Sequence, residues 1–163
     1  MKKVKKLLVI LTMLTAVFSL SCSSVYAGDL RKGTCRVVLF DEELLTNANE
    51  LVYNGHRYLS GDLYALIFSI AMEYSDLDCD YSYSETNPYS GYATYYFTPS
   101  GYMTLKAGSV NGRIGYYYDA DDFTLIYPAA MYDSQMYVSM EDIAELIGCN
   151  YGFDAYKNTM YFY

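Results

Sequence analysis

The sequence predicts an α+β fold in which two helices accompany antiparallel β-sheet. The first observation is a pattern that occurs twice, consisting of a polar turn, a short β-prone run, a serine and a helical segment. The second is that the remaining β-prone runs follow one another in series, separated by turns. The third is composition, since 22 tyrosines and no tryptophan favour strands with one hydrated face.

The repeated pattern indicates an internal duplication. The copies align without gaps through their strands, whose last residues, Ser60 and Ser139, are 79 positions apart. Matching the helices through Asp62 and Asp142 then requires one inserted residue. Self-similarity of this kind is typical of a repeated unit, here a hairpin, a helix and a second hairpin. We expect the repeat units at about residues 37–83 and 113–163.

The first strands follow from β-propensity and turn chemistry. Cys35–Phe40 is rich in branched and aromatic residues and is expected to be the opening strand. The polar segment 41–50 is expected to form a short helical turn or a loop. Asn54-Gly55 supplies positive φ angles, which predicts a tight hairpin between Leu51–Tyr53 and His56–Leu59.

Two helices are predicted, each shortly after a serine that can cap it. The first should run from Leu63 to Tyr74 and bury a single face, because its apolar residues recur at helical spacing. The second should begin after Ser139, carry acidic residues in its first turn and end at Gly148 in the left-handed conformation. The expected buried face of the first helix consists of Leu63, Leu66, Ile67, Ile70 and Ala71.

The rest of the chain is expected to be strands joined by turns. Segment 75–91 should hold one strand flanked by an exposed loop, and Asp119–Asp122 should be a turn. Pro99-Ser100-Gly101 should join two strands in a hairpin, and segment 154–158 should close the last hairpin. The other expected strands are Tyr92–Thr98, Tyr102–Ala107, Arg113–Tyr118, Phe123–Tyr127, Tyr137-Val138, Asn150–Phe153 and Thr159–Tyr163.

Residues 1–27 are expected to be a signal peptide. Four lysines precede the apolar stretch Leu7–Leu20, and Val25-Tyr26-Ala27 has small residues at the positions that a signal peptidase recognises. Removing the segment leaves 163 − 27 = 136 residues, which suits a single domain over 28–163. A competing interpretation makes Cys22 a lipid-modified anchor. Under either interpretation the protein leaves the cytoplasm and is secreted or attached to the cell surface.

Charge and cysteine content restrict the classes of partner. All 19 acidic residues but only 7 of the 11 basic ones follow residue 27, so the mature net charge is 7 − 19 = −12. This charge repels phosphate, so no nucleic acid partner is expected, and no integral membrane span is expected in the mature chain. Cys35, Cys79 and Cys149 allow either free buried thiols or one disulfide bond.

Catalytic and metal-binding patterns are weak, so we expect neither an enzyme nor a cofactor. His56 is the only histidine, which leaves no multi-histidine metal site, and its place beside a turn predicts a solvated side chain. Asp76 begins a calcium-like loop, but Tyr81 and Asn87 occupy the positions that need glycine and glutamate. Weak calcium binding by the acidic segment 119–122 is left open.

A longer pattern lies in the second copy and its tail. It comprises Tyr137-Val138, a helix ending in Ala144-Glu145-Leu146-Ile147-Gly148, the pair Phe153-Asp154 and the closing strand Thr159-Met160-Tyr161-Phe162. This order resembles the stalk domain named after the N-terminal domain of bacterial copper amine oxidases, a family that often carries the unit twice. Leu105-Lys106-Ala107-Gly108-Ser109 also resembles the mid-domain strand of that family.

The resemblance has departures and a functional implication. Ser139-Met140-Glu141 stands where the family has proline, leucine and arginine, Phe153 replaces a tryptophan, and Ser60-Gly61 is also unusual. The copper and quinone chemistry of the oxidases belongs to a separate catalytic domain. The resemblance therefore implies an extracytoplasmic accessory module with no established activity.

Strand tyrosines are the candidate binding residues. Several recur at i, i+2 and should share a sheet face, and a face opposite the core that displays rings would form an amphipathic platform. Packing of aromatic pairs across strands is the alternative that needs no ligand. We expect a non-enzymatic module for protein interaction or surface assembly, including self-association; the alternative is a carbohydrate-binding module for cell-wall or host glycans. The candidates are Tyr81, Tyr83, Tyr95, Tyr116, Tyr118, Tyr161 and Tyr163.

Overall fold

The computed structural model describes residues 30–73, 79–116 and 119–163, so the expected signal peptide lies outside the described residues. The prediction of an α+β fold is confirmed, because two helices accompany mainly antiparallel sheets in this part of the chain. The helices are α2 (Gly61–Glu73) and α3 (Met140–Ile147). The strands are β1 (Arg31–Leu39), β2 (Glu42–Tyr53), β3 (His56–Ser60), β4 (Asp80–Asn87), β5 (Tyr92–Thr98), β6 (Gly101–Lys106), β7 (Asn111–Tyr116), β8 (Asp119–Thr124), β9 (Ala130–Tyr132), β10 (Gln135–Ser139), β11 (Tyr151–Asp154) and β12 (Thr159–Phe162).

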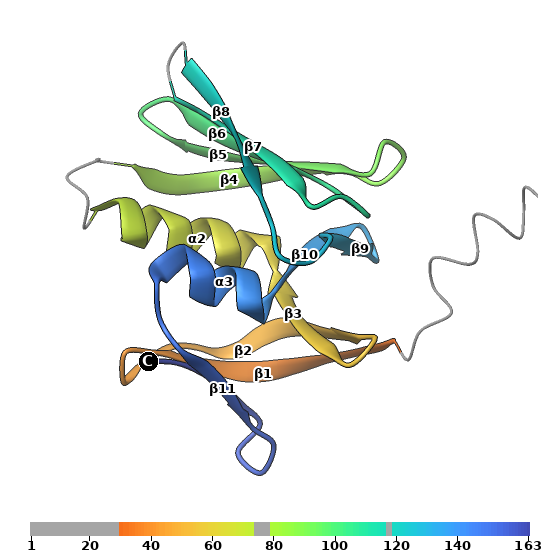
Figure 1. Cartoon of the computed structure of the whole chain (residues 1–163), viewed down its shortest axis with the longest axis vertical. Coiled ribbons are helices and arrows are strands. Elements are labelled where there is room, and N and C mark those ends of the chain that lie inside the picture. The colour runs from red at the N-terminus through yellow and green to blue at the C-terminus, as the bar shows by residue number, and fades with distance from the viewer. Residues whose placement is uncertain (1–29, 74–78, 117–118) are drawn as a thin grey trace, which may run out of the picture.

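The described elements form three layers, with both helices between two sheets (Figure 1). One sheet has seven strands in the order β11-β12-β1-β2-β3-β10-β9, and the other has five in the order β4-β5-β6-β7-β8. Neighbouring strands run antiparallel except β1 and β12, which pair in parallel. Each sheet therefore keeps one face against the helices and turns the other face outward.

The two copies of the repeated pattern meet at the β3–β10 pairing. Leu59 lies opposite Val138, and Tyr58 lies opposite Ser139. Because the copies are offset by 79 positions, Leu59 and Val138 are equivalent residues, so each copy contacts its counterpart through the same position. The duplication itself stays an interpretation of the sequence. If a twofold axis relates the two copies, it requires this register, in which equivalent residues of β3 and β10 lie opposite each other.

Capping geometry corrects the alignment of the two helices. The Leu63 N–H donates to Ser60 Oγ at 3.3 Å, and the Asp142 N–H donates to Ser139 Oγ at 3.0 Å. Both caps use the residue three positions after the serine, so the inserted residue expected from matching Asp62 with Asp142 is wrong. Asp62 instead corresponds to Glu141.

The first helix is buried on two faces rather than one. Leu63 and Ile67 are buried as expected, but Tyr64 and Phe68 are buried as well. The Phe68 ring lies 5.3 Å from the ring of Phe97 in β5, because the five-stranded sheet covers the side of α2 that the sequence pattern assigns to solvent. The single-face prediction is therefore wrong, and the cause is the second sheet.

Two polar segments are strands, contrary to expectation. Segment 41–50 lies mostly in β2, where Ala48 and Glu50 are buried against the core and exposed residues alternate with them. Asp119–Asp122 lies in β8, an edge strand that pairs only with β7. In both cases pairing with a neighbouring strand outweighs the low β-propensity of aspartate and glutamate. The acidic side chains are exposed except that of Glu50, which pairs with Arg57.

The seven-stranded sheet is strongly curled. The Arg57 guanidinium of β3 lies 3.3 Å from the ring centroid of Phe153 in β11, although three strands separate β3 from β11. Arg57 also forms an ion pair with the buried carboxylate of Glu50. The curl wraps this sheet around the helices, so Leu66 of α2 and Leu146 of α3 pack against one common core.

The three cysteines of the described chain carry free thiols. Cys35 and Cys79 are buried in the core, and Cys149 is half-buried. This agrees with the interpretation of small apolar residues rather than with the alternative of one disulfide bond. Neither helix in the described ranges has the length and apolar character needed to cross a bilayer.

Buried tyrosines should make the fold sensitive to alkaline pH. Burial raises the pKa of Tyr58 and Tyr81 to about 12 and raises the pKa of Tyr64 and Tyr95 as well. A raised folded-state pKa contributes stability that is complete below the unfolded value of about 10 and is lost as pH rises above it. We expect absorbance at 295 nm to rise first for exposed tyrosines and then abruptly with unfolding; a single step near pH 10 with unchanged circular dichroism would contradict this.

Candidate functional site

A β-bulge separates the first pair of candidate tyrosines. Tyr81 lies opposite Phe97 and Tyr83 lies opposite Tyr96, with a register shift between the two pairs. Tyr81 therefore faces the core, where its hydroxyl donates to Asp62 Oδ1 at 2.6 Å, whereas Tyr83 faces outward. The rule that i and i+2 share a face fails here because a bulge adds one residue to the strand.

The other candidate tyrosines do not converge on one surface. Tyr95 is buried against the helices, and Tyr116 is half-buried on the same inner side. Tyr161 and Tyr163 belong to the seven-stranded sheet. They alternate with the buried Phe162, so their side chains point to the face of that sheet opposite Phe162. Tyr118 lies outside the described residues.

The outer face of the five-stranded sheet carries a row of tyrosines that were mostly missed from the sequence. The pairings place Tyr83, Tyr96 and Tyr102 side by side on β4, β5 and β6. The rings of Tyr83 and Tyr96 are stacked, with centroids 4.6 Å apart and planes inclined by 21°. The Tyr102 ring covers Gly115, its hydroxyl lying 2.8 Å from where a Cβ would be. Strand alternation with the buried Tyr95 and Met103 would have identified Tyr96 and Tyr102.

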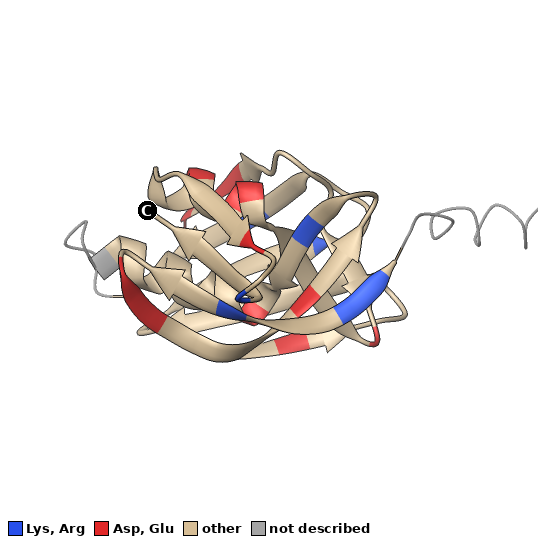
Figure 2. Ribbon diagram, turned by 90° about the horizontal axis from the view of Figure 1, so that it is seen from below, with Lys and Arg blue, Asp and Glu red and all other residues tan. Residues whose placement is uncertain are grey.

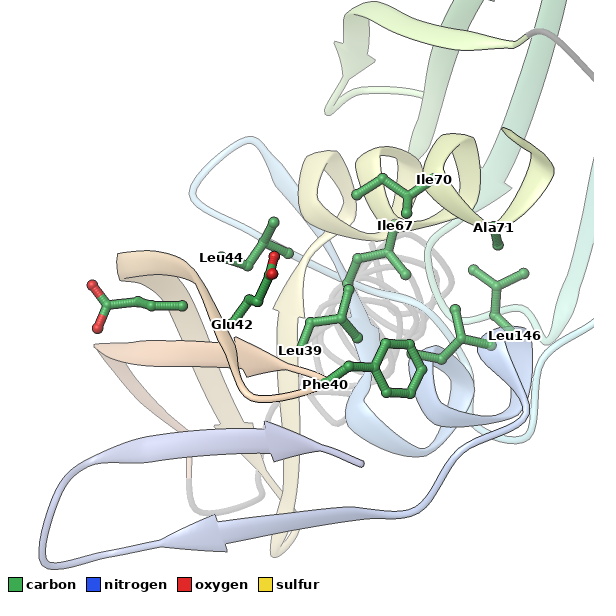
Figure 3. A pocket seen from close by; sticks show the side chains of 10 residues that line it. Leu39, Phe40, Glu42, Leu44, Ile67, Ile70, Ala71 and Leu146 are labelled. Atoms are coloured by element: carbon green, nitrogen blue, oxygen red, sulfur yellow. The ribbon is translucent and has the colours of Figure 1, made fainter. Parts of the chain in front are cut away.

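An apolar groove of about 780 Å³ lies where the ends of both helices meet the β1–β2 turn. Figure 3 shows Leu39, Phe40 and Leu44 from the turn region on one side, with Ile70 and Leu146 on the helices facing them. The residues that line this surface, hereafter the groove, are Leu39, Phe40, Glu42, Glu43, Leu44, Ile67, Ile70, Ala71, Leu146 and Ile147.

Phe40 is held at the groove in an unusual backbone conformation. Its φ is 48° and that of Asp41 is 69°, so both turn residues are left-handed although neither is glycine. A left-handed phenylalanine costs on the order of 1 kcal/mol or more. The Phe40 N–H donates to the carbonyl of Phe162 at 2.9 Å, which fixes this turn against β12. The conformation closes the two-residue hairpin loop between Leu39 and Glu42, and it leaves the Phe40 side chain 54% exposed.

The rim of the groove is acidic. Glu42 and Glu43 line the groove, Asp41 precedes them in the turn, and all three are exposed. Arg36 pairs with Glu43. Figure 2 shows this acidic turn at one end of β1 and β2, while the basic residues at the start of β1 lie at the opposite end.

A second concave surface lies between the tip of the β2–β3 hairpin, β9 and the β6–β7 turn. Its volume is about 720 Å³, and four tyrosines and the single histidine contribute to its wall. Tyr58 is almost fully buried at its base, and Tyr53, Tyr127 and Tyr132 are half-buried around it. The residues that line this surface, hereafter the tyrosine cleft, are Leu30, Leu51, Tyr53, Asn54, His56, Tyr58, Ala107, Gly108, Tyr127, Pro128, Ala129, Ala130, Met131 and Tyr132.

His56 is not the solvated loop residue that the sequence predicts. Its ring centroid lies 4.1 Å from that of Tyr127, and its Nδ1 lies 3.3 Å from Glu141 Oε1. The other oxygen of Glu141 is buried without a hydrogen-bond partner among the described residues. The loop before β9 is drawn against α3 by Asp142, whose carboxylate accepts from the N–H groups of Ile126 and Tyr127. This contact places Tyr127 over His56.

Metal-ligating side chains of the described residues are His, Cys, Asp and Glu. No three His, Cys, Asp or Glu side chains there gather closely enough to hold an ion. Along β8, Asp119 and Asp121 point to one face of the sheet, and Asp122 points to the opposite face. Asp76 lies outside the described residues.

Comparisons with known proteins leave the resemblance to the copper amine oxidase stalk domain as a prediction. No family model matches the chain, and neither a curated protein nor a solved structure does.

Proposed function

We propose that the protein is a non-enzymatic extracytoplasmic module that binds another protein through the groove. The single observation that carries this proposal is Phe40, an aromatic side chain kept exposed beside Leu44, Ile70 and Leu146 by a left-handed turn. Contiguous apolar surface that the fold does not cover is typical of interaction sites. The two-residue loop between the paired Leu39 and Glu42 sets the turn conformation, and a phenylalanine stands there where asparagine or glycine would be unstrained.

Charge complementarity defines the partner as a segment with both apolar and basic residues. Asp41, Glu42 and Glu43 border the groove, and the mature chain has a net charge of 7 − 19 = −12. A Lys- or Arg-bearing amphipathic helix would place its apolar side on Phe40 and its cations on the rim. Two copies of this chain would repel each other, so a different protein is favoured over self-association.

The tyrosine row fits glycan recognition less well than this groove fits a protein. Stacking on a sugar needs ring faces that are open and roughly coplanar, whereas Tyr83 and Tyr96 stack on each other. Their contact is the cross-strand packing that stabilises antiparallel sheet. The carbohydrate alternative is favoured by a different observation, the tyrosine cleft, whose lining has no Asp, Glu, Lys or Arg.

A photo-crosslinking experiment tests the groove. A photoreactive phenylalanine is placed at position 40, or at position 156 as a control, because Tyr156 is 99% exposed in a distant turn. We expect a specific adduct from position 40 in envelope extracts of the producing cells. Binding of the identified partner should weaken at least about tenfold for Phe40→Ser, since burial of a large side chain in an interface commonly exceeds 1.4 kcal/mol.

A matched substitution outside the groove, Tyr156→Ser, separates a specific effect at Phe40 from a general loss of surface tyrosine or phenylalanine. Tyr156→Ser should bind the partner unchanged, and raising the salt concentration should weaken binding because the rim is charged. The proposal is wrong if both positions give the same adducts, or if purified partner binds Phe40→Ser as tightly as the unaltered protein. Thermal unfolding of Phe40→Ser checks that the fold is intact.

A further inference from the structure

The tyrosine cleft is uncharged in an otherwise acidic protein. The groove contains Glu42 and Glu43, and a smaller cavity beside α2 contains Asp119 and Asp121. Within the described residues, no Asp, Glu, Lys or Arg lines the tyrosine cleft. An uncharged wall favours an uncharged ligand, because a buried charge without a partner is costly.

Two side chains at the rim of the cleft, Lys32 and His56, each contact a carboxylate. Lys32 Nζ lies 2.9 Å from Asp133 Oδ2 and 5.7 Å from the ring centroid of Tyr132 at the rim. His56 Nδ1 faces Glu141 Oε1 at 3.3 Å. The Lys32 cation therefore has its own carboxylate, and Glu141 does not line the cleft, so the cleft wall presents no Asp, Glu, Lys or Arg to an ionic ligand.

The polar groups of the cleft both donate and accept hydrogen bonds. Phenol groups come from Tyr53, Tyr58, Tyr127 and Tyr132, and His56 adds an imidazole. Burial raises the pKa of Tyr58 to about 12, so its phenol stays protonated at neutral pH. Sugar hydroxyls have the same dual character, so they match groups of this kind.

We propose that the tyrosine cleft binds a neutral oligosaccharide, with a pyranose ring stacked on the half-buried tyrosines and its hydroxyls bonded to the phenol and imidazole groups. The C–H faces of a pyranose are apolar and match aromatic rings, while its edge is polar. A volume of about 720 Å³ is within the range of small-ligand sites. This site shares no residue with the groove, so the inference goes beyond the proposed protein interaction.

A proline-rich peptide is the competing occupant of an aromatic surface. Such a peptide presents carbonyl acceptors but few donors, because proline has no N–H. It would leave the acceptor capacity of Asn54 and His56 unmatched. The saccharide is favoured for that reason, and the peptide becomes an outcome of the test.

The test is a titration of the isotope-labelled protein with cellotetraose, chitotetraose, xylotetraose and maltotetraose, and separately with a proline decamer. Amide signals of Ala107, Gly108, Ala130 and Met131, which line the cleft, should shift with at least one saccharide. Tyr127→Ala should weaken that binding at least about tenfold, because it removes a stacking face. Tyr127→Phe keeps the ring and should stay within about threefold, a difference well under 1.4 kcal/mol.

Crossed controls separate this site from the groove. Phe40→Ser should leave saccharide binding unchanged, and Tyr127→Ala should leave partner binding at the groove unchanged. The inference is overturned if none of the four saccharides shifts the cleft signals at about 10 mM, a concentration that would reveal even a millimolar affinity. It is also overturned if only the proline decamer shifts them, or if folded Tyr127→Ala binds as tightly as the unaltered protein.

Discussion

Replacing Val138 with aspartate is expected to unfold most of the protein. Val138 is fully buried and lies opposite the equally buried Leu59 at the meeting of the two repeated segments. An unpaired carboxylate there would cost about 4 kcal/mol or more, which is a large part of the stability of an ordinary domain. Circular dichroism during heating should show a midpoint lowered by at least about 15 °C, or no cooperative transition at all.

The equivalent substitution gives a second readout. Leu59→Asp should be as damaging as Val138→Asp, because the two residues occupy the same position in their copies. Tyr89→Asp serves as the control, since Tyr89 is 100% exposed, and it should change stability by less than about 0.5 kcal/mol. A stable, cooperative Val138→Asp variant would show that this pairing is not at the centre of the core.

Replacing Gly61 with alanine is expected to destabilise the protein by about 2–3 kcal/mol, although alanine is a better helix former than glycine. A Cβ at position 61 would overlap the hydroxyl of Tyr95, lie 2.7 Å from its Cζ and approach the carbonyl of Met136. Tyr95 is fully buried and has no room to move aside. The close approach of the five-stranded sheet to the start of α2 is thus the physical reason for a glycine at position 61.

Chemical denaturation measures the free energy of unfolding of Gly61→Ala, and two further variants serve as comparisons. Gly33→Ala should be nearly neutral, because the closest atom to a Cβ there is Glu50 Oε2 at 3.9 Å. Combining Gly61→Ala with Tyr95→Phe removes the overlapping hydroxyl and should recover part of the loss. Equal stability of Gly61→Ala and the unaltered protein would mean that α2 does not approach β5 this closely.

Local signals in the sequence identified the repeated segments well. The turn at Asn54-Gly55, the serine caps and the left-handed Gly148 all lie where expected. These features depend on residues near each other in the chain, so a single sequence contains the information. The open five-stranded sheet over α2 depends on long-range packing, which is why the helix periodicity alone assigned Phe68 to the wrong environment.

The candidate sites were harder to predict than the fold. The tyrosine candidates were chosen by i, i+2 spacing, and the bulge between Tyr81 and Tyr83 broke that rule at one residue. Phe40 was assigned to a strand, because nothing local marks a Phe-Asp pair as a left-handed turn. His56 and Tyr127 meet only because Asp142 draws a distant loop against α3.

The parallel pairing of β1 with β12 has a consequence for how the chain matures. Asn158 Nδ2 donates to the carbonyl of Thr34 across 124 positions, and β12 fills the place between β1 and β11. The first described strand therefore cannot complete its ladder until residues 159–162 have been synthesised. Such long-range closure slows folding, and β1 keeps one edge unpaired until β12 is added.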